Sequence, residues 1–122
     1  NLKEIQESTP FQVLPNLDSL KKASEFLRKK SGAKNTIITL SEKGMFIDDG
    51  QNIEIIPTQI RNITDVCGAG DSVISLTALG LAIKLELNEI AKLANLAGGQ
   101  VCEKVGVVPV DKNQLKQEFK EL

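Results

Sequence analysis

The sequence predicts an α/β fold, because patterns typical of helices and of strands alternate along one short chain. Apolar residues recur at helical spacing from Leu17 to Gly32, and the β-branched run Thr36 to Leu40 follows. A glycine-rich loop then precedes the uncharged run Ser72 to Ile83, which is typical of a buried helix. No internal repeat, low-complexity tract or linker interrupts this order, so we expect a single domain over residues 1–122.

The first two helices are predicted from capping and periodicity. Asn1 followed by Glu4 is a common helix start, with the asparagine as cap and the glutamate in the first turn. After an irregular connection, charged residues alternate with an apolar stripe formed by Leu20, Ala23, Phe26 and Leu27. This pattern predicts an amphipathic helix from Leu17 to Gly32.

A strand and a hairpin are predicted next. The β-branched run Thr36 to Leu40 is typical of a central strand that helices cover on both faces. Beyond a loop over residues 41–44, two apolar segments, 45–48 and 52–56, flank the dipeptide Asp49-Gly50. That dipeptide favours tight hairpin turns, so we expect a β-hairpin here.

The stretch from Thr64 to Ser72 holds the residues best suited to chemistry. Gly68 and Gly70 have no Cβ, so the backbone can turn tightly and approach a ligand closely. The first turn of the following helix has unpaired amides that, with the helix dipole, attract a phosphate. We expect this helix to be buried, because apolar residues surround it on all sides: Val73, Ile74, Leu76, Leu79, Leu81 and Ile83.

Asp71 has two explanations. From spacing alone, a carboxylate in the first helical turn is most often a partner of the helix dipole. Beside backbone donors it can also act as the base for an attacking hydroxyl group. Both explanations stay open at the level of spacing.

The C-terminal part is predicted to be helical. A helix from Glu86 to about Lys104 contains two consecutive glycines, Gly98 and Gly99, which each cost about 0.5–1 kcal/mol in a helix interior. We expect close contacts to offset that cost, and we interpret the neighbouring alanines as a stripe for tight packing. An extended segment over residues 104–110 follows, and then a short solvated helix that Asp111 caps.

Composition excludes several classes of function. The 122 residues are 41% hydrophobic and 25% charged, which is ordinary for a globular protein, and no uncharged run is long enough to span a bilayer. A net charge of −1 and only four aromatic residues, all Phe, argue against nucleic-acid binding. With no His and two distant cysteines, Cys67 and Cys102, the usual zinc sites are excluded. We expect both thiols to be free in a reducing cytoplasm.

The run Asp65-Val66-Cys67-Gly68-Ala69-Gly70-Asp71 resembles the D-T-x-G-A-G-D signature of the ribokinase-like (PfkB) carbohydrate kinases. The resemblance implies a ribokinase-like, Rossmann-like three-layer fold, of which this chain is the C-terminal nucleotide-binding half with a β-hairpin. It also implies ATP-dependent phosphoryl transfer to a sugar hydroxyl. The amides of Gly68, Ala69 and Gly70 would form an anion hole, and Asp71 would take the proton of the hydroxyl.

Other positions matching the family imply contacts with ATP and metal ions. Mg²⁺ is expected near the N-x-x-E pattern, held through water, because Mg²⁺ keeps several waters and takes few carboxylates. Ser41 stands where many family members have glycine. The implied residues are Asn1 and Glu4 for Mg²⁺ and phosphates, Thr39, Ser41, Gly44 and Asn95 for the nucleotide, and Asp65, Val101, Lys104 and Gly106 for a monovalent cation, K⁺.

Three segments, 39–45, 65–74 and 93–107, are most similar to the kinase module of the bacterial heptose-7-phosphate kinases, whose partner is an adenylyltransferase. This similarity implies conversion of heptose 7-phosphate to heptose 1,7-bisphosphate for lipopolysaccharide precursor synthesis in the cytoplasm. Kinases for ribose, fructose or a nucleoside remain alternatives, as does a nucleotide-binding or regulatory module without chemistry.

Family members carry roughly one more domain on the N-terminal side, with most sugar contacts and the lid. We therefore expect this chain to be a C-terminal fragment that is inactive alone, because the sugar-positioning half is absent. An unpaired sheet edge at Thr36 to Leu40 is expected to favour a homodimer.

Cys67 stands in the glycine loop where many relatives have Thr. A cysteine at a helix N-terminus can have a lowered pKa and become a reactive thiolate. The alternative, which we favour, is a small buried side chain selected for packing, because free cysteines are among the most buried residues.

Overall fold

The computed structural model describes all residues from 1 to 122, and the chain divides into two compact units. The N-terminal unit, Asn1–Pro57, contains helices α1 (Leu2–Ser8) and α2 (Leu17–Ser31) and strands β1 (Thr36–Thr39), β2 (Met45–Asp48) and β3 (Ile53–Ile56). A 3₁₀ turn, η1 (Ser41–Lys43), connects β1 and β2. The C-terminal unit, Thr58–Leu122, contains α3 (Ala69–Ala82), α4 (Leu87–Cys102) and α5 (Lys112–Lys120).

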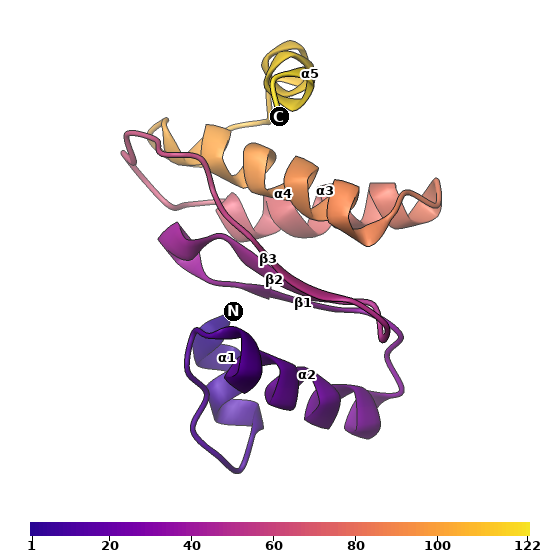
Figure 1. Cartoon of the computed structure of the whole chain (residues 1–122). Helices are drawn as coiled ribbons and strands as arrows, with labels where there is room; N and C mark the ends of the chain where they lie inside the picture. The colour runs from indigo at the N-terminus through magenta and orange to yellow at the C-terminus, as the bar shows by residue number, and fades with distance from the viewer. The chain divides into compact units, whose positions relative to one another are not determined.

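The sheet of the N-terminal unit is antiparallel, with strand order β1-β2-β3 (Figure 1). Ile38 pairs with Phe46, and Ile47 pairs with Glu54, so the predicted hairpin is confirmed. The prediction of a central strand at Thr36–Leu40 is wrong within this chain, because β2 is central and β1 is an edge strand. A β-branched run indicates that both faces are covered, but it does not indicate the place of a strand in the sheet. The unpaired edge expected at β1 is present.

The two helices of this unit lie on the same face of the sheet (Figure 1). Between helices and sheet is a core whose buried members are Ile5, Val13, Leu20, Ala23, Ile38, Leu40 and Phe46. The capping predictions are confirmed, since Asn1 accepts a hydrogen bond from the amide of Glu4 and α2 stops at Gly32 with a φ of 72°. Local sequence signals therefore place both helices.

A buried carboxylate ties the hairpin to α2. Asp48, at the end of β2, accepts hydrogen bonds from Ser24 Oγ at 2.6 Å, from Arg28 Nη1 at 3.0 Å and from the amide of Gly50 at 2.7 Å. Each oxygen of this buried group thus has a partner, which is what burial of a charge requires.

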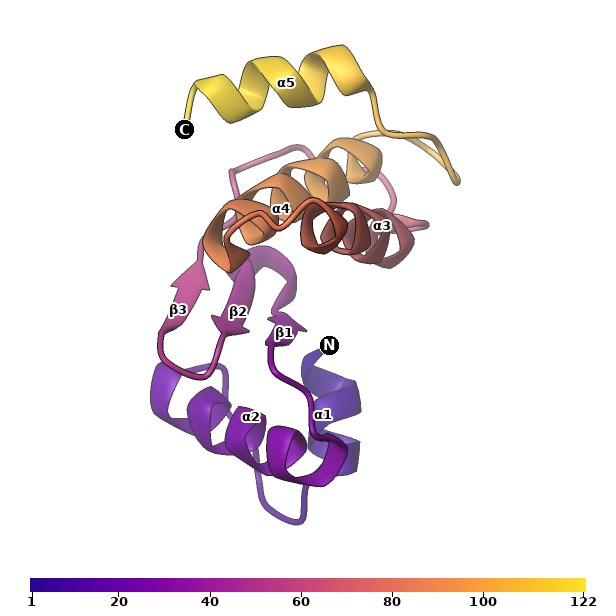
Figure 2. The same ribbon diagram turned by 90° about the vertical axis from the view of Figure 1, so that its right-hand side faces the viewer.

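In the C-terminal unit α3 and α4 lie side by side, and α5 packs on α4 (Figure 2). Glycines allow the close approach of α3 to α4: a Cβ built on Gly98 would lie 3.1 Å from Val73 Cγ2, and one on Gly80 would lie 2.6 Å from Ile90 Cγ1. The contacts expected at the two glycines of α4 are confirmed, because the side chain of Arg61 lies against Gly99.

The prediction that α3 is buried is wrong for this chain. Only Thr77 and Gly80 are buried, because α3 packs against α4 along one side. The rest of its surface, which we call the outer face of α3 and to which we add the C-cap Ile83, exposes 63% of Ile74, 63% of Leu79, 45% of Leu81 and 71% of Ile83. Apolar residues on all sides of a helix indicate that every side avoids water. They do not indicate which part of the protein covers each side. None of the helices is both long and apolar enough to cross a membrane.

Candidate active site

The glycine loop forms the N-terminus of α3. Gly68 is the N-cap, with φ 78° and ψ −3°, a left-handed conformation that glycine adopts without strain. No side chain caps this end of the helix, so no side-chain oxygen accepts a hydrogen bond from its first-turn amides. Among them, the amide of Ala69 makes a long 3.3 Å turn bond to the carbonyl of Val66. The geometry fits an anion site, because amide donors and the helix dipole point to the same place.

Asp71 lies in the first turn of this helix and lines an open pocket of about 440 Å³. The residues Gly68, Ser72, Ser75 and Leu76 form one wall, and residues 107–110 form the other. Asp71 is exposed, so its carboxylate can accept a proton from a hydroxyl group bound in the pocket. The arrangement combines a base with amide donors within one turn of α3.

The wall formed by residues 107–110 was missed by the sequence analysis, which predicted only an extended segment. Gly68 packs against this wall, since a Cβ built on Gly68 would lie 3.4 Å from Val107 Cγ1. The available signal was Gly106, whose φ of 74° turns the chain before the wall begins.

Asp65 holds the glycine loop and the turn at Gly106 together. Its two carboxylate oxygens accept hydrogen bonds from the amide of Gly106 at 2.9 Å and from the amide of Cys67 at 3.1 Å. These bonds hold the pKa of Asp65 below its usual value, and the bond from Gly106 has the largest effect. Asp65 and Gly106, two of the expected K⁺ ligands, are thus in direct contact.

The other expected cation ligands lie nearby in sequence and structure. At the end of α4, the carbonyl of Val101 accepts a hydrogen bond of 3.2 Å from the amide of Lys104. The chain has no group of three or more Asp, Glu or Cys side chains that could hold a metal ion. The contacts to K⁺ and Mg²⁺ therefore stay predictions.

The expected nucleotide and Mg²⁺ residues of the N-terminal unit fall at two places. Asn1 and Glu4 are exposed at the start of α1. Thr39 is the last residue of β1, and Ser41 and Gly44 belong to the tight turn that follows, where the amide of Gly44 donates to the carbonyl of Ser41 at 3.1 Å.

Two positions in this turn are left-handed. Ser41 has φ 55° and Gly44 has φ 94°. A left-handed φ explains why glycine suits the position of Ser41, since a side chain is strained there. Asn95, the expected adenine contact, is half-buried on α4 in the C-terminal unit.

Neither interpretation of Cys67 fits the structure. The side chain is exposed, so the buried packing residue that we favoured is wrong. Hydrogen bonding with the carboxylate of Asp65, together with its charge, raises the pKa of the Cys67 thiol, so the lowered pKa is also wrong. The effect of this adjacent carboxylate was not expected from the sequence alone.

Comparison with known proteins gives a consistent result. Residues 1–113 match the family described as pfkB family carbohydrate kinase. The chain is 42% identical over 106 residues to the bifunctional protein HldE of Aliarcobacter butzleri, a match that covers 87% of this chain and 22% of that protein. The chain thus spans about a quarter of the length of the curated relatives it matches.

Solved structures show the same fold. Phosphofructokinase-2 from Escherichia coli in complex with substrates and products has a TM-score of 0.89 at 21% identity, over 100% of this chain and 39% of that one. Arabidopsis thaliana ribokinase complexed with ribose and ATP has a TM-score of 0.88 at 18% identity, over 98% of this chain and 39% of that one. The predicted ribokinase-like α/β fold is confirmed.

Proposed function

The chain belongs to the pfkB family of carbohydrate kinases, and on this premise we propose that it is the nucleotide-binding and catalytic part of an enzyme that transfers the γ-phosphoryl group of ATP to a sugar hydroxyl. The observation that carries this proposal is the uncapped N-terminus of α3 with the Asp71 carboxylate in the adjoining pocket. An alcohol that attacks phosphorus needs a positioned base and donors for the charge of the phosphoryl group. Both are present within one helical turn.

In the proposed mechanism Asp71 accepts the proton of the sugar hydroxyl as its oxygen attacks the γ-phosphorus. The bond from phosphorus to the bridging oxygen of ATP breaks, and ADP leaves. The amides of Gly68, Ala69 and Gly70 stabilise the charge on the transferred group, and Gly70 has open space around it for a close phosphate. Mg²⁺ bound to the phosphates would offset their charge, and the exposed Glu4 carboxylate, with Asn1 beside it, would contact the ion through water.

For the acceptor we propose heptose 7-phosphate, which would become heptose 1,7-bisphosphate for lipopolysaccharide precursor synthesis in the cytoplasm. Support comes from the three segments that resemble the heptose-7-phosphate kinases and from the identity to proteins named HldE. Thr39, Ser41, Gly44 and Asn95 are proposed to contact the nucleotide, and Asp65 with the carbonyls of Val101, Lys104 and Gly106 to bind K⁺.

We also propose that the chain is the C-terminal part of a longer kinase and is inactive alone. Two observations support this: the curated relatives are about four times longer, and the outer face of α3 exposes large apolar side chains that a folded protein normally covers.

The proposal is tested with Asp71→Asn in the complete protein that contains this chain. We expect the rate of phosphoryl transfer from ATP to heptose 7-phosphate to fall by about 10²–10⁴-fold, the usual contribution of a general base. ATP affinity, measured by calorimetry, should change little, because the amide keeps the shape of the carboxylate. Ribose and fructose serve as alternative acceptors in the same assay.

The matched control is Asp111→Asn, which changes the same group at the cap of α5, where asparagine caps equally well. Its transfer rate should equal that of the wild type. An unchanged rate in Asp71→Asn would show that Asp71 is not the base. A wild type that binds ATP but transfers no phosphoryl group would be a nucleotide-binding module without this chemistry.

A further inference from the structure

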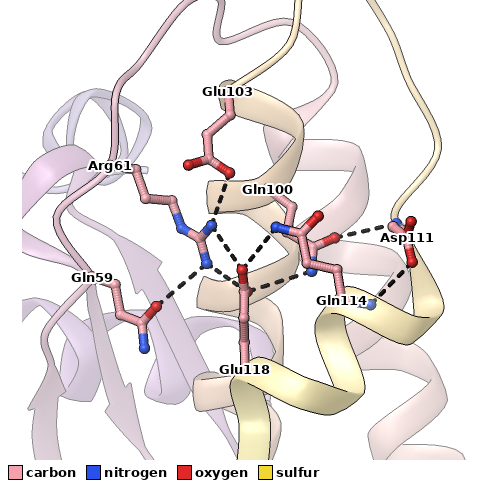
Figure 3. Close-up of polar contacts among 7 residues, drawn as sticks. All are labelled: Gln59, Arg61, Gln100, Glu103, Asp111, Gln114 and Glu118. Carbon is pink, nitrogen blue, oxygen red and sulfur yellow. Dashed lines mark hydrogen bonds and ion pairs between the residues drawn. The ribbon is translucent and has the colours of Figure 1, made fainter. Parts of the chain in front are cut away.

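Arg61 has a buried side chain that lies outside the pocket. Its side chain is 7% exposed, and its guanidinium forms a fork with the carboxylate of Glu118 on α5. The two bonds run from Nη1 to Oε1 at 3.1 Å and from Nη2 to Oε2 at 2.6 Å (Figure 3). Nη1 also donates to Glu103 at the end of α4, at 3.0 Å. Two-point contacts of this kind fix orientation as well as distance.

Other polar groups complete the partners of Glu118. Gln114 Nε2 donates to Oε1 at 2.8 Å, and Gln100 Nε2 donates to Oε2 at 3.4 Å (Figure 3). Gln100 is itself 2% exposed, and its Oε1 accepts a hydrogen bond of 3.2 Å from the amide of Asp111. Burial raises the pKa of Glu118, but the hydrogen bonds from Arg61 and Gln114 outweigh it, so that the pKa lies below its usual value. The carboxylate therefore stays charged opposite Arg61 at neutral pH.

The stem of Arg61 is seated on α4. A Cβ built on Gly99 would lie 2.5 Å from Arg61 Nε and 2.8 Å from Cδ, so the helix has space for this side chain only because residue 99 is glycine. α5, expected to be solvated, has no fully buried residue, but Glu118 is only 17% exposed. Helix α5 thus contributes one carboxylate to a site built on α4.

A short series of bonds connects Arg61 to the glycine loop. The segment from Arg61 to Cys67 has neither helix nor strand, so side chains and single backbone bonds hold it. The amides of Thr64 and Asp65 both donate to the carbonyl of Cys102, at 2.8 and 3.1 Å. The carboxylate of Asp65 then accepts a hydrogen bond from the amide of Cys67, and Gly68 is the next residue.

We infer that Arg61 is a positioning residue for the glycine loop and that Glu118 of α5 is the partner that holds it in place. The fork fixes one end of segment 61–67 on α4, and Asp65 fixes the other end, immediately before Gly68 and one turn before Asp71. Lysine could not replace this arginine, because a single ammonium cannot make the two parallel bonds. The part of this inference that concerns turnover rests on the proposed function.

The test uses Glu118→Gln in the complete protein, with Glu121→Gln as the matched control. Both remove one negative charge from the same end of α5, but the carboxylate of Glu121 accepts its hydrogen bond from Gln117 on the same helix. Hydrogen exchange is measured for the amides of Thr64, Asp65 and Cys67. We expect about tenfold faster exchange in Glu118→Gln, from local opening of the segment, and less than about twofold change in the control.

The second readout separates positioning from a general loss of stability. A displaced loop should lower kcat for phosphoryl transfer by about tenfold, with KM for ATP within about twofold, since the lost contacts matter in the transition state. Arg61→Lys keeps the positive charge but cannot make the two parallel bonds to Glu118, so it should show the same fall in kcat with KM for ATP nearly unchanged. This variant replaces Glu118→Gln in the test if Glu118→Gln does not fold. Unchanged exchange would overturn the inference, as would faster exchange with wild-type kcat.

The two proposals fail in different ways. If the wild-type protein transfers no phosphoryl group to any sugar, the proposed function fails, and the exchange measurement alone decides whether Arg61 fixes the loop. If the wild type is active and Glu118→Gln matches it in exchange and kcat, only the role of Arg61 fails.

Discussion

Gly68 and Gly70 stand two residues apart, yet a side chain would meet different surroundings at each. Gly68 has a left-handed φ of 78° and packs against Val107, so an added Cβ is strained by the backbone. Gly70 lies in the first turn of α3 with nothing within 4 Å of its built Cβ. The first glycine is therefore required by the fold, whereas no contact within the fold requires the second.

Alanine at each position separates these two requirements. Gly68→Ala should lower the free energy of unfolding by about 1–2 kcal/mol, the cost of a left-handed residue with a Cβ. Gly70→Ala should leave it unchanged or raise it by about 0.5–1 kcal/mol, since alanine favours a helix. Urea unfolding measures both in the complete protein.

The effect of Gly70→Ala on kinase activity should be opposite to its effect on stability. Gly70→Ala should lower phosphoryl transfer although the protein is at least as stable, because the methyl group occupies the space next to the first-turn amides. Full activity in Gly70→Ala would show that no phosphate approaches this backbone.

At the scale of elements, Asp65 joins the segment before α3 to the turn after α4. Its pKa is lowered by the amides of Gly106 and Cys67, so its folded value lies below the unfolded value of about 3.9. Its contribution to stability is therefore present above that unfolded value and is lost as pH falls through the folded value.

Asp65→Asn is expected to remove this pH-dependent contribution. The difference in urea midpoint between wild type and Asp65→Asn should be largest at neutral pH and shrink as the pH falls below about 4. Glu121→Gln changes an exposed carboxylate whose hydrogen bond comes from Gln117 on the same helix. This variant should show no comparable trend. A difference that stays constant from neutral pH to pH 3 would contradict the role of the Asp65 charge.

At the scale of the whole chain, the outer face of α3 exposes Ile74, Leu79, Leu81 and Ile83. Exposed large apolar side chains of this kind favour association when nothing covers them. The β1 edge offers a second route to association, because its backbone groups are unpaired on one side.

Light scattering of residues 1–122 distinguishes the two routes. We expect the chain to self-associate and Leu79→Lys to reduce this, since a charge on the outer face of α3 opposes burial. Leu14→Lys, at a leucine that is 47% exposed in the N-terminal unit, is the control and should have no effect. Association that Leu79→Lys leaves unchanged would point to the β1 edge, and a monomer at high concentration would contradict both.

The local features of this protein follow from the sequence alone. Asn1, Gly32 and Asp111 mark helix ends where predicted, Asp49-Gly50 lies in the hairpin turn over residues 49–52, and Gly68 begins α3. Each depends on interactions within about four residues, such as a cap or a left-handed glycine, so a short stretch of sequence is sufficient to determine it.

Tertiary structure decided the features that depend on distant residues. Arg61 and Glu118 are 57 residues apart, and Asp65 and Gly106 are 41 apart, so neither pair follows from periodicity or spacing. Cys67 shows that a local contact can also be missed, because the side chain of Asp65, two residues before it, turns back onto the loop and raises the pKa of the thiol. The exposed face of α3 shows the remaining limit: a sequence records that a surface avoids water, whereas the fold determines which atoms cover it.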